Sequence, residues 1–100
     1  MVKDKLIAAK ELIGDESKWV KGSFARDAAN KTVNYADSTA CRWCMLGAIW
    51  HCGVTPEETY LVKDIAGLGG QSLIDINDSC ITKHSDVMAV MDKLILAAGD

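Results

Sequence analysis

The most apolar stretch of this chain lies in its middle, where residues 40–54 read ACRWCMLGAIWHCGV. Arg42 and His51 are the clearly polar members of this stretch. A helix with apolar side chains on nearly every side has to be covered by other elements, because a bare face would leave hydrophobic surface in water. The pattern therefore predicts a central helix around which the other elements pack.

Local signals set the expected ends of the first two helices. The first helix is expected over residues 2–13, where apolar residues recur every three to four positions, and Gly14 would form a left-handed cap at its end. Asp37 or Ser38 could accept hydrogen bonds from the free amides that open the central helix. Gly53 would end that helix.

The tetrapeptide Thr55-Pro56-Glu57-Glu58 predicts the start of a third helix. Thr55 suits the N-cap, Pro56 suits the first helical position, and Glu58 completes a capping box. The helix is expected over residues 56–66. Its expected buried face consists of Tyr60, Leu61 and Ile65.

A fourth helix is expected after Thr82, which would cap it. Its apolar residues repeat at three- and four-residue steps, at Val87, Val90, Met91, Leu94 and Ala98. The pattern is less regular elsewhere: we expect a short helical turn over residues 24–29 and extended chain over 32–35 and 73–76. The predicted fold is mainly α, a compact four-helix single domain around the central apolar helix. The extended segments could add a short two-stranded ribbon.

Composition narrows the class of protein. The 100 residues are 49% hydrophobic, which suits one globular domain over residues 1–100. The net charge is −3 and no dense basic run occurs, so nucleic acid is a disfavoured partner. Charges every few residues near the N-terminus argue against a secretory segment or a membrane span, so we expect a cytoplasmic protein without a membrane partner. Its four cysteines are then expected to be reduced.

The cysteines raise the question of a metal site. On one continuous helix Cys41, Cys44 and Cys52 would share a face, but Cys44 and Cys52 would lie about 12 Å apart along the axis. One tetrahedral zinc ion needs its thiolates nearly in contact, so this helix cannot supply all three ligands. A site built from Cys41, Cys44, Cys80 and His84 remains open. The default interpretation is that the cysteines are small core residues, and we predict no metal and no cofactor.

A cysteine nucleophile is the second chemical possibility. Cys44 or Cys41 could act as the thiolate, with His51 or His84 as the base. On the predicted helix, however, His51 would lie about 10 Å beyond Cys44, which is too far for a hydrogen bond. The sequence therefore predicts no catalytic residue.

Trp43 and Trp50 are seven residues apart, which on the predicted helix places them on one face, opposite the cysteines. We expect both to pack in the core. Tryptophan is also enriched at interface hot spots, so a partly exposed Trp50 would indicate a protein partner or a homodimer.

A spaced set of residues runs through most of the chain: Trp19, Gly22, Ala25-Arg26-Asp27, Ala40-x-x-Trp43-Cys44-x-x-Gly47-Ala48, and Asn77-Asp78. This order resembles a family of small uncharacterised domains of unknown function encoded by bacteria and their phages. Cys44 is the cysteine that matches the family pattern. The family commonly has a glycine where this chain has Asn30-Lys31. The resemblance implies a phage or mobile-element origin and carries no activity with it.

The same pattern suggests a cluster. If Trp19, Asp27, Cys44, Asn77 and Asp78 converge, they form either a buried polar staple or the wall of a pocket, and the staple is the expected outcome. Asn77 and Asp78 could then satisfy the open helix ends or the indole N–H of Trp19, because unpaired buried polar groups cost about 1–3 kcal/mol each.

These observations predict a small non-enzymatic protein that acts by binding another protein, with a host factor as the target if the phage origin holds. The alternative is a thiol-dependent enzyme or a small-ligand domain centred on Cys44. The candidate binding residues are Trp19, Asp27, Trp43, Cys44, Trp50, Asn77 and Asp78.

Overall fold

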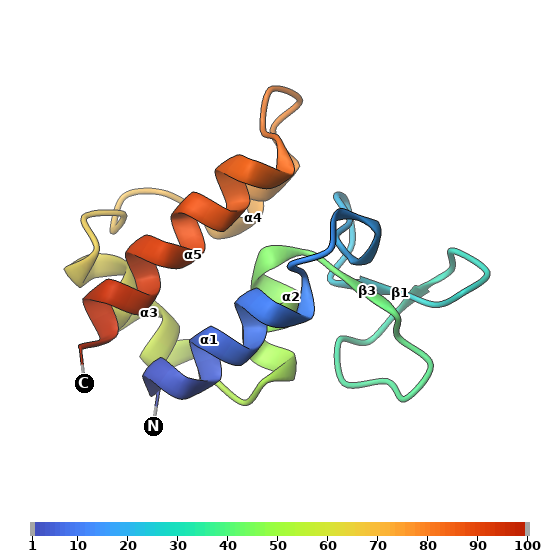
Figure 1. Ribbon diagram of the computed structural model, residues 1–100, viewed down its shortest axis with the longest axis horizontal. Helices are drawn as coiled ribbons and strands as arrows, with labels where there is room; N and C mark the ends of the chain where they lie inside the picture. The colour runs from blue at the N-terminus through green and yellow to red at the C-terminus, as the bar shows by residue number, and fades with distance from the viewer. Residues whose placement is uncertain (1, 100) are drawn as a thin grey trace.

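A computed structural model describes residues 2–99, which form five α-helices, one short 3-10 helix and three two-residue strands (Figure 1). In chain order these are α1 (Val2–Leu12), η1 (Glu16–Lys18), β1 (Ala25–Arg26), β2 (Thr32–Val33), β3 (Arg42–Trp43), α2 (Met45–His51), α3 (Pro56–Ile65), α4 (Leu73–Asp78) and α5 (His84–Ala98). The fold is mainly α, as the sequence predicts. The described residues nevertheless form one helix and one strand more than expected.

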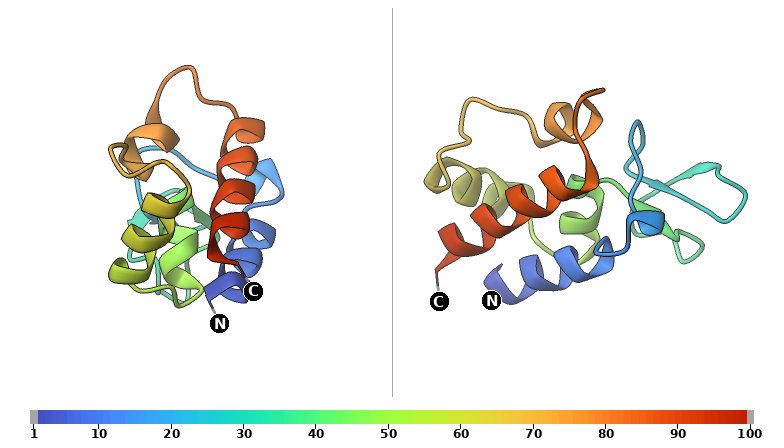
Figure 2. Two further views of the ribbon diagram at one scale, coloured as in Figure 1. Left: turned by 90° about the vertical axis from the view of Figure 1, so that its left-hand side faces the viewer. Right: turned by 45° about the horizontal axis from the view of Figure 1, so that its top comes forward.

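The helices form one body, with the strands and their loops at one end of it (Figures 1 and 2). The first and last helices, α1 and α5, lie side by side and run in opposite directions. Helix α2 packs against α1 and α4, and α3 packs against α5. The core between them holds fully buried side chains that come from both ends and the middle of the chain, among them Leu6, Ile13, Met45, Ile49 and Met91.

The expected central helix over residues 40–54 is only partly correct. Its second half is α2, and residues 45–49 are all buried, as a central apolar helix requires. Its first half contains strand β3, and Cys44 is the N-cap in place of Asp37 or Ser38. An apolar run suits a buried strand as well as a buried helix, so periodicity alone could not separate the two. Gly53 does follow the helix end, with a φ of 96°.

The new helix boundary changes the expected positions of the cysteines and tryptophans. Cys41 precedes β3 and Cys44 caps α2, so Cys41, Cys44 and Cys52 do not share the face of one helix. Trp43 lies in β3 and Trp50 in α2. The prediction that both tryptophans lie on one face of a single helix is therefore wrong.

Strand β1 is the middle strand of a small antiparallel sheet in the order β2-β1-β3. Ala25 is opposite Val33 and Trp43, and these three residues form the face that packs on the core. The neighbouring row of Thr32, Arg26 and Arg42 points to the opposite face, because successive side chains alternate along a strand. The extended expectation for residues 32–35 is thus correct at β2, whereas the helical turn expected over 24–29 is wrong.

Helix α3 begins as predicted, with Thr55 as N-cap and a complete capping box to Glu58. Its predicted buried face is wrong: Tyr60, Leu61 and Ile65 are 65%, 62% and 61% exposed. Thr59 and Val62 are buried instead. The helix lies at the edge of the body and packs along a narrow stripe, so its larger apolar side chains face outward.

Three further expectations differ from the structure. Residues 73–76 belong to helix α4, which Ser72 caps, and are not extended. Lys83, not Thr82, is the N-cap residue of α5, and the Thr82 hydroxyl donates to the carbonyl of Ile76 at 2.6 Å. Gly14 is not among the residues with positive φ, so α1 ends without the expected left-handed cap.

Within residues 2–99 no helix is both long and apolar enough to cross a membrane.

Candidate functional site

Asn77 of α4 is fully buried, and its side chain makes four hydrogen bonds. Its Oδ1 accepts from the indole Nε1 of Trp19 at 2.6 Å and from the backbone N of Met45 at 3.0 Å. Its Nδ2 donates to the carbonyl of Val20 at 3.0 Å and to Oδ1 of Asp78 at 2.9 Å. Since both partners of Oδ1 are donors, the network fixes the orientation of the amide.

This network joins three parts of the chain. Met45 is the first residue of α2, and its N–H is one of the amides that a helix start leaves without an intrahelical partner. Asp78 continues the network, because its Oδ1 also accepts from the backbone N of Gly22 at 3.0 Å. The hydrogen bonds expected from Asn77 and Asp78 to a helix end and to Trp19 are therefore confirmed for Asn77.

Cys44 lies next to this network and is 3% exposed. Its Sγ accepts from the backbone N of Gly47 at 3.2 Å and caps α2. Burial raises the pKa of the Cys44 thiol, and the nearby Asp78 carboxylate raises it further, although the Gly47 amide acts in the opposite direction. The thiol is therefore protonated near neutral pH, which makes it a poor nucleophile.

Both histidines donate to backbone carbonyls. His51 Nδ1 lies 2.6 Å from the Tyr35 oxygen, and His84 Nε2 lies 2.7 Å from the Ile13 oxygen. A carbonyl only accepts, so each of these ring nitrogens carries a hydrogen. In the part of the chain that the structure describes, neither ring bonds to Cys44, and the Cys–His pair that a thiol enzyme would need is not formed.

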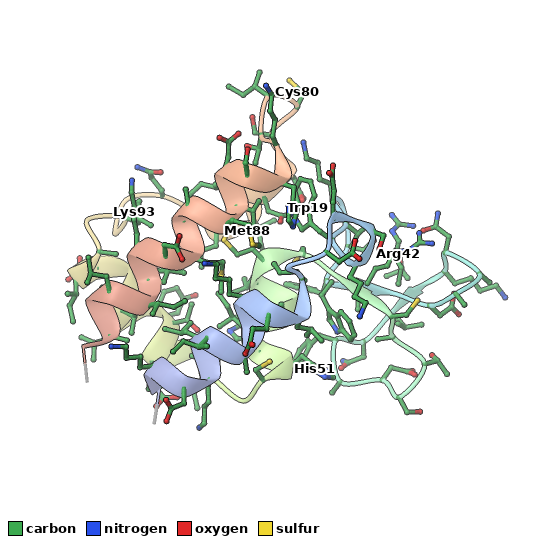
Figure 3. The ribbon with its side chains drawn as sticks, viewed as in Figure 1. Trp19, Arg42, His51, Cys80, Met88 and Lys93 are labelled. Atoms are coloured by element: carbon green, nitrogen blue, oxygen red, sulfur yellow. The ribbon has the colours of Figure 1, made fainter. Side chains whose placement is uncertain are left out.

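The four residues considered for a metal site are dispersed. Cys44 is buried, whereas Cys80 is exposed at the tip of the loop between α4 and α5 (Figure 3). His84 packs its ring on Trp19, with 5.8 Å between the centroids. Among residues 2–99 no group of three or more His, Cys, Asp or Glu side chains is placed to hold a metal ion.

Asp27 does not join the predicted cluster. Its Oδ1 accepts from the backbone N of Ala29 and of Lys31, both at 2.9 Å, and so stabilises its own turn. The remaining members, Trp19, Cys44, Asn77 and Asp78, do lie together.

Trp50 belongs to an aromatic cluster that no pattern in the sequence predicts. Its ring is 5.5 Å from Phe24 in a stacked arrangement and 5.7 Å from Tyr35. Trp50 is half-buried, and its Nε1 donates to the Thr59 hydroxyl at 3.3 Å. Trp43, by contrast, is buried and donates from Nε1 to the Tyr35 carbonyl at 3.2 Å.

Two surface pockets, each about 250 Å³ in volume, share Ile74 of α4 as a common wall. We call the first the α3 pocket; it is lined by Leu46, Trp50, Pro56, Thr59, Tyr60, Lys63, Ser72, Leu73 and Ile74. We call the second the Cys44 pocket; it is lined by Gly22, Ser23, Phe24, Thr32, Cys44, Ile74 and Asp78. The stacked pair of Phe24 and Trp50 contributes one ring to each pocket.

A family model described as "Family of unknown function (DUF6197)" matches residues 1–97. The chain belongs to this family. No curated protein and no solved structure matches this chain significantly.

One sequence signal could have located the shared wall of the two pockets in this DUF6197 chain. Ser72 and Asp75 have the spacing of a helix start, in which a serine is followed three residues later by an acidic residue. The Ser72 hydroxyl does accept from the backbone N of Asp75, at 3.4 Å. Recognising that cap predicts a helix at 73–78 and places Ile74 in its first turn. No comparable local signal predicts the contact between Phe24 and Trp50.

Proposed function

We propose that the protein is a non-enzymatic binding domain that holds a segment of another protein by two apolar side chains, one in the α3 pocket and one in the Cys44 pocket. The observation that carries the proposal is the shared wall. Ile74 is 38% exposed and stands between two hollows of equal volume. Adjacent pockets for side chains of one segment are a recurring mode of peptide recognition.

Pocket size favours a peptide over a small molecule. Each pocket has a volume of about 250 Å³, below the roughly 300–1,000 Å³ that is typical of small-molecule sites. A single bulky side chain is a better match for each. Trp50 and Tyr60 in the α3 pocket and Phe24 in the Cys44 pocket supply the aromatic contacts that are enriched in protein interfaces.

Charged groups stand in both pockets. Lys63 lies in the α3 pocket, where its Nζ donates to the carbonyl of Gln71 at 2.6 Å, and Asp78 lies in the Cys44 pocket. These opposite charges would favour one direction of a bound segment over the other, since complementary charges orient a partner more than they strengthen binding. If the chain has a phage origin, we propose that the partner is a host protein.

Selection from a displayed library of random peptides tests the proposal. Purified protein is used to enrich binders, and dissociation constants of the enriched peptides are measured by fluorescence polarisation. Ile74→Arg should weaken binding by about 2 kcal/mol, or about thirtyfold in Kd, because one change obstructs both pockets. Leu96→Arg is the matched control, since Leu96 is exposed and lines neither pocket.

Enriched peptides with two apolar residues, and affinities that fall for Ile74→Arg alone, support the proposal. A dimer of the chain, detected by light scattering and abolished by the same substitution, supports it with a second copy as the partner. Equal affinities for the two variants, or a selection that enriches no such peptide, would overturn it.

A further inference from the structure

Arg26 and Arg42 are directly opposite each other on β1 and β3. Like charges at directly opposed positions of an antiparallel pair destabilise a sheet. Both residues lie on the sheet face that points away from the core, and Figure 3 shows Arg42 at the end of the molecule where the strands lie. The arrangement therefore concentrates positive charge on one side of the sheet in a protein whose net charge is −3.

No acidic side chain offsets this charge at close range. Among residues 2–99, neither guanidinium has a carboxylate oxygen within 4 Å, and the ion pair that the structure does form joins Lys10 to Asp92 at 2.6 Å. Two carboxylates on neighbouring segments are engaged elsewhere. Asp27 accepts from the amides of its own turn, and Asp78 accepts from Gly22 and Asn77.

Asn30 holds both arginine side chains in place. Its backbone oxygen accepts from Arg26 Nη1 at 3.0 Å, and its side-chain Oδ1 accepts from Arg42 Nη1 at 3.1 Å. Asn30 has a φ of 66°, a left-handed conformation that costs energy in residues other than glycine. A glycine at position 30 would adopt this conformation more easily, but it would lose the contact to Arg42.

The anchored guanidiniums keep unused donors. Nη1 of each arginine is occupied by Asn30, whereas Nε of Arg26 is buried and has no hydrogen-bond partner. Since this Nε is covered by protein atoms, Arg26 can donate to an external group only through its terminal Nη atoms. Nη2 of Arg26 lies beside Gly22, where a Cβ would stand 3.9 Å from it.

From this juxtaposition we infer that Arg26 and Arg42, positioned by Asn30, form a binding site for a phosphate monoester or inorganic phosphate. A phosphate monoester carries about −1.5 to −2 charges near pH 7, so one group can offset both arginines. Arg42 can donate to phosphate oxygens in a planar, bidentate geometry through the Nε–Nη2 edge that Asn30 leaves unused, and Arg26 can add a donor from Nη2. The site adjoins the Cys44 pocket at Gly22 and Thr32, but the inference does not depend on the proposed function.

Titration with inorganic phosphate, followed by NMR of the arginine Nε–H groups at constant ionic strength, tests the inference. The Nε–H signals of Arg26 and Arg42 should shift and saturate. Arg42→Gln should weaken binding about tenfold or more, because it removes one charged donor set. Lys31→Gln is the matched control, because it removes one positive charge from the turn between β1 and β2 and leaves Arg26 and Arg42 unchanged. It should leave the affinity for phosphate within about twofold.

Asn30→Gly is the second variant, because it retains the left-handed turn while releasing Arg42. It should weaken phosphate binding without unfolding the protein. A phosphoserine peptide and acetate complete the set of probes. Peptide binding as tight as that of free phosphate identifies a phosphorylated protein as the source, whereas phosphate binding alone identifies the free ion.

Equal affinity in Arg42→Gln and Lys31→Gln would overturn the inference. Acetate binding as tight as phosphate, or shifts that chloride reproduces at the same ionic strength, would do the same.

Discussion

Asn77 lies where the N-terminal segment, α2 and α4 meet, and its side chain replaces the solvent for several groups at once. The indole N–H of Trp19, the first N–H of α2 and the carbonyl of Val20 all find their partner in one amide. A short polar side chain with two donors and two acceptor positions is well suited to this task. An apolar residue of similar size would fill the space and leave these groups unpaired.

Asn77→Ala should therefore lower the free energy of unfolding by about 3 kcal/mol, because each buried polar group left without a partner costs about 1–3 kcal/mol. Urea denaturation followed by tryptophan fluorescence measures the change. Asn34→Ala is the matched control: Asn34 is exposed and accepts from the backbone N of Ala36 in its own turn. Asn34→Ala should lower the free energy of unfolding by less than about 1 kcal/mol, because it removes only a local hydrogen bond within a turn. Similar costs for the two substitutions would contradict the role assigned to Asn77.

At the scale of elements, Gly47 allows the backbone of α2 to lie close to the chain just before β1. A Cβ at this position would lie 2.1 Å from the backbone oxygen of Phe24. The same oxygen accepts from the backbone N of Cys44 at 3.1 Å, so it cannot move away without breaking a hydrogen bond. The helix and the chain before β1 are thus packed backbone to backbone.

Gly47→Ala should destabilise the protein by about 3 kcal/mol, even though alanine favours a helix by about 1 kcal/mol over glycine. The steric term decides the sign because the clash is with backbone on both sides. Thermal unfolding monitored by circular dichroism provides the measurement. Gly70→Ala, where a Cβ would meet no atom within 4 Å, should leave the melting temperature nearly unchanged. A Gly47→Ala protein as stable as the wild type would show that the two segments are not in contact.

At the scale of the whole molecule, the four cysteines report on how tightly the chain is packed. Cys80 is exposed, Cys41 and Cys52 are half-buried and Cys44 is buried. Burial raises the pKa of the thiols of Cys52 and Cys44. Because these pKa values are raised in the folded protein, the neutral thiols contribute fully to the free energy of unfolding below the ordinary thiol pKa of about 8.5. This contribution is lost as the pH rises above that value through the raised pKa.

Alkylation by iodoacetamide near pH 8, read by mass spectrometry, should therefore label Cys80 first and Cys44 last. In urea the four rates should become similar, since unfolding removes the differences in exposure. Rapid labelling of Cys44 in the folded protein would instead favour the thiol-dependent alternative, because an activated nucleophile reacts as a thiolate.

The sequence by itself determined the parts of this structure that depend on neighbours along the chain. The capping box from Thr55 to Glu58 requires only a hydrogen bond between residues three apart, and the periodicity of α1 and α5 requires only one apolar face. Asn77 was also a candidate from sequence through the family pattern that it shares, and a polar partner for a buried indole and a helix start is what such a residue could supply.

Only the tertiary structure decided the features that depend on distant partners. Residues 42–43 form a strand because they pair with Ala25 and Arg26 of β1. Without that pairing, their apolar pattern is equally compatible with a helix. Tyr60, Leu61 and Ile65 are exposed because α3 lies at the edge of the body, a position that its own pattern does not encode. The two pockets and the arginine pair exist because folding brings together groups from separate segments, and contacts of that kind leave no periodic trace in the sequence.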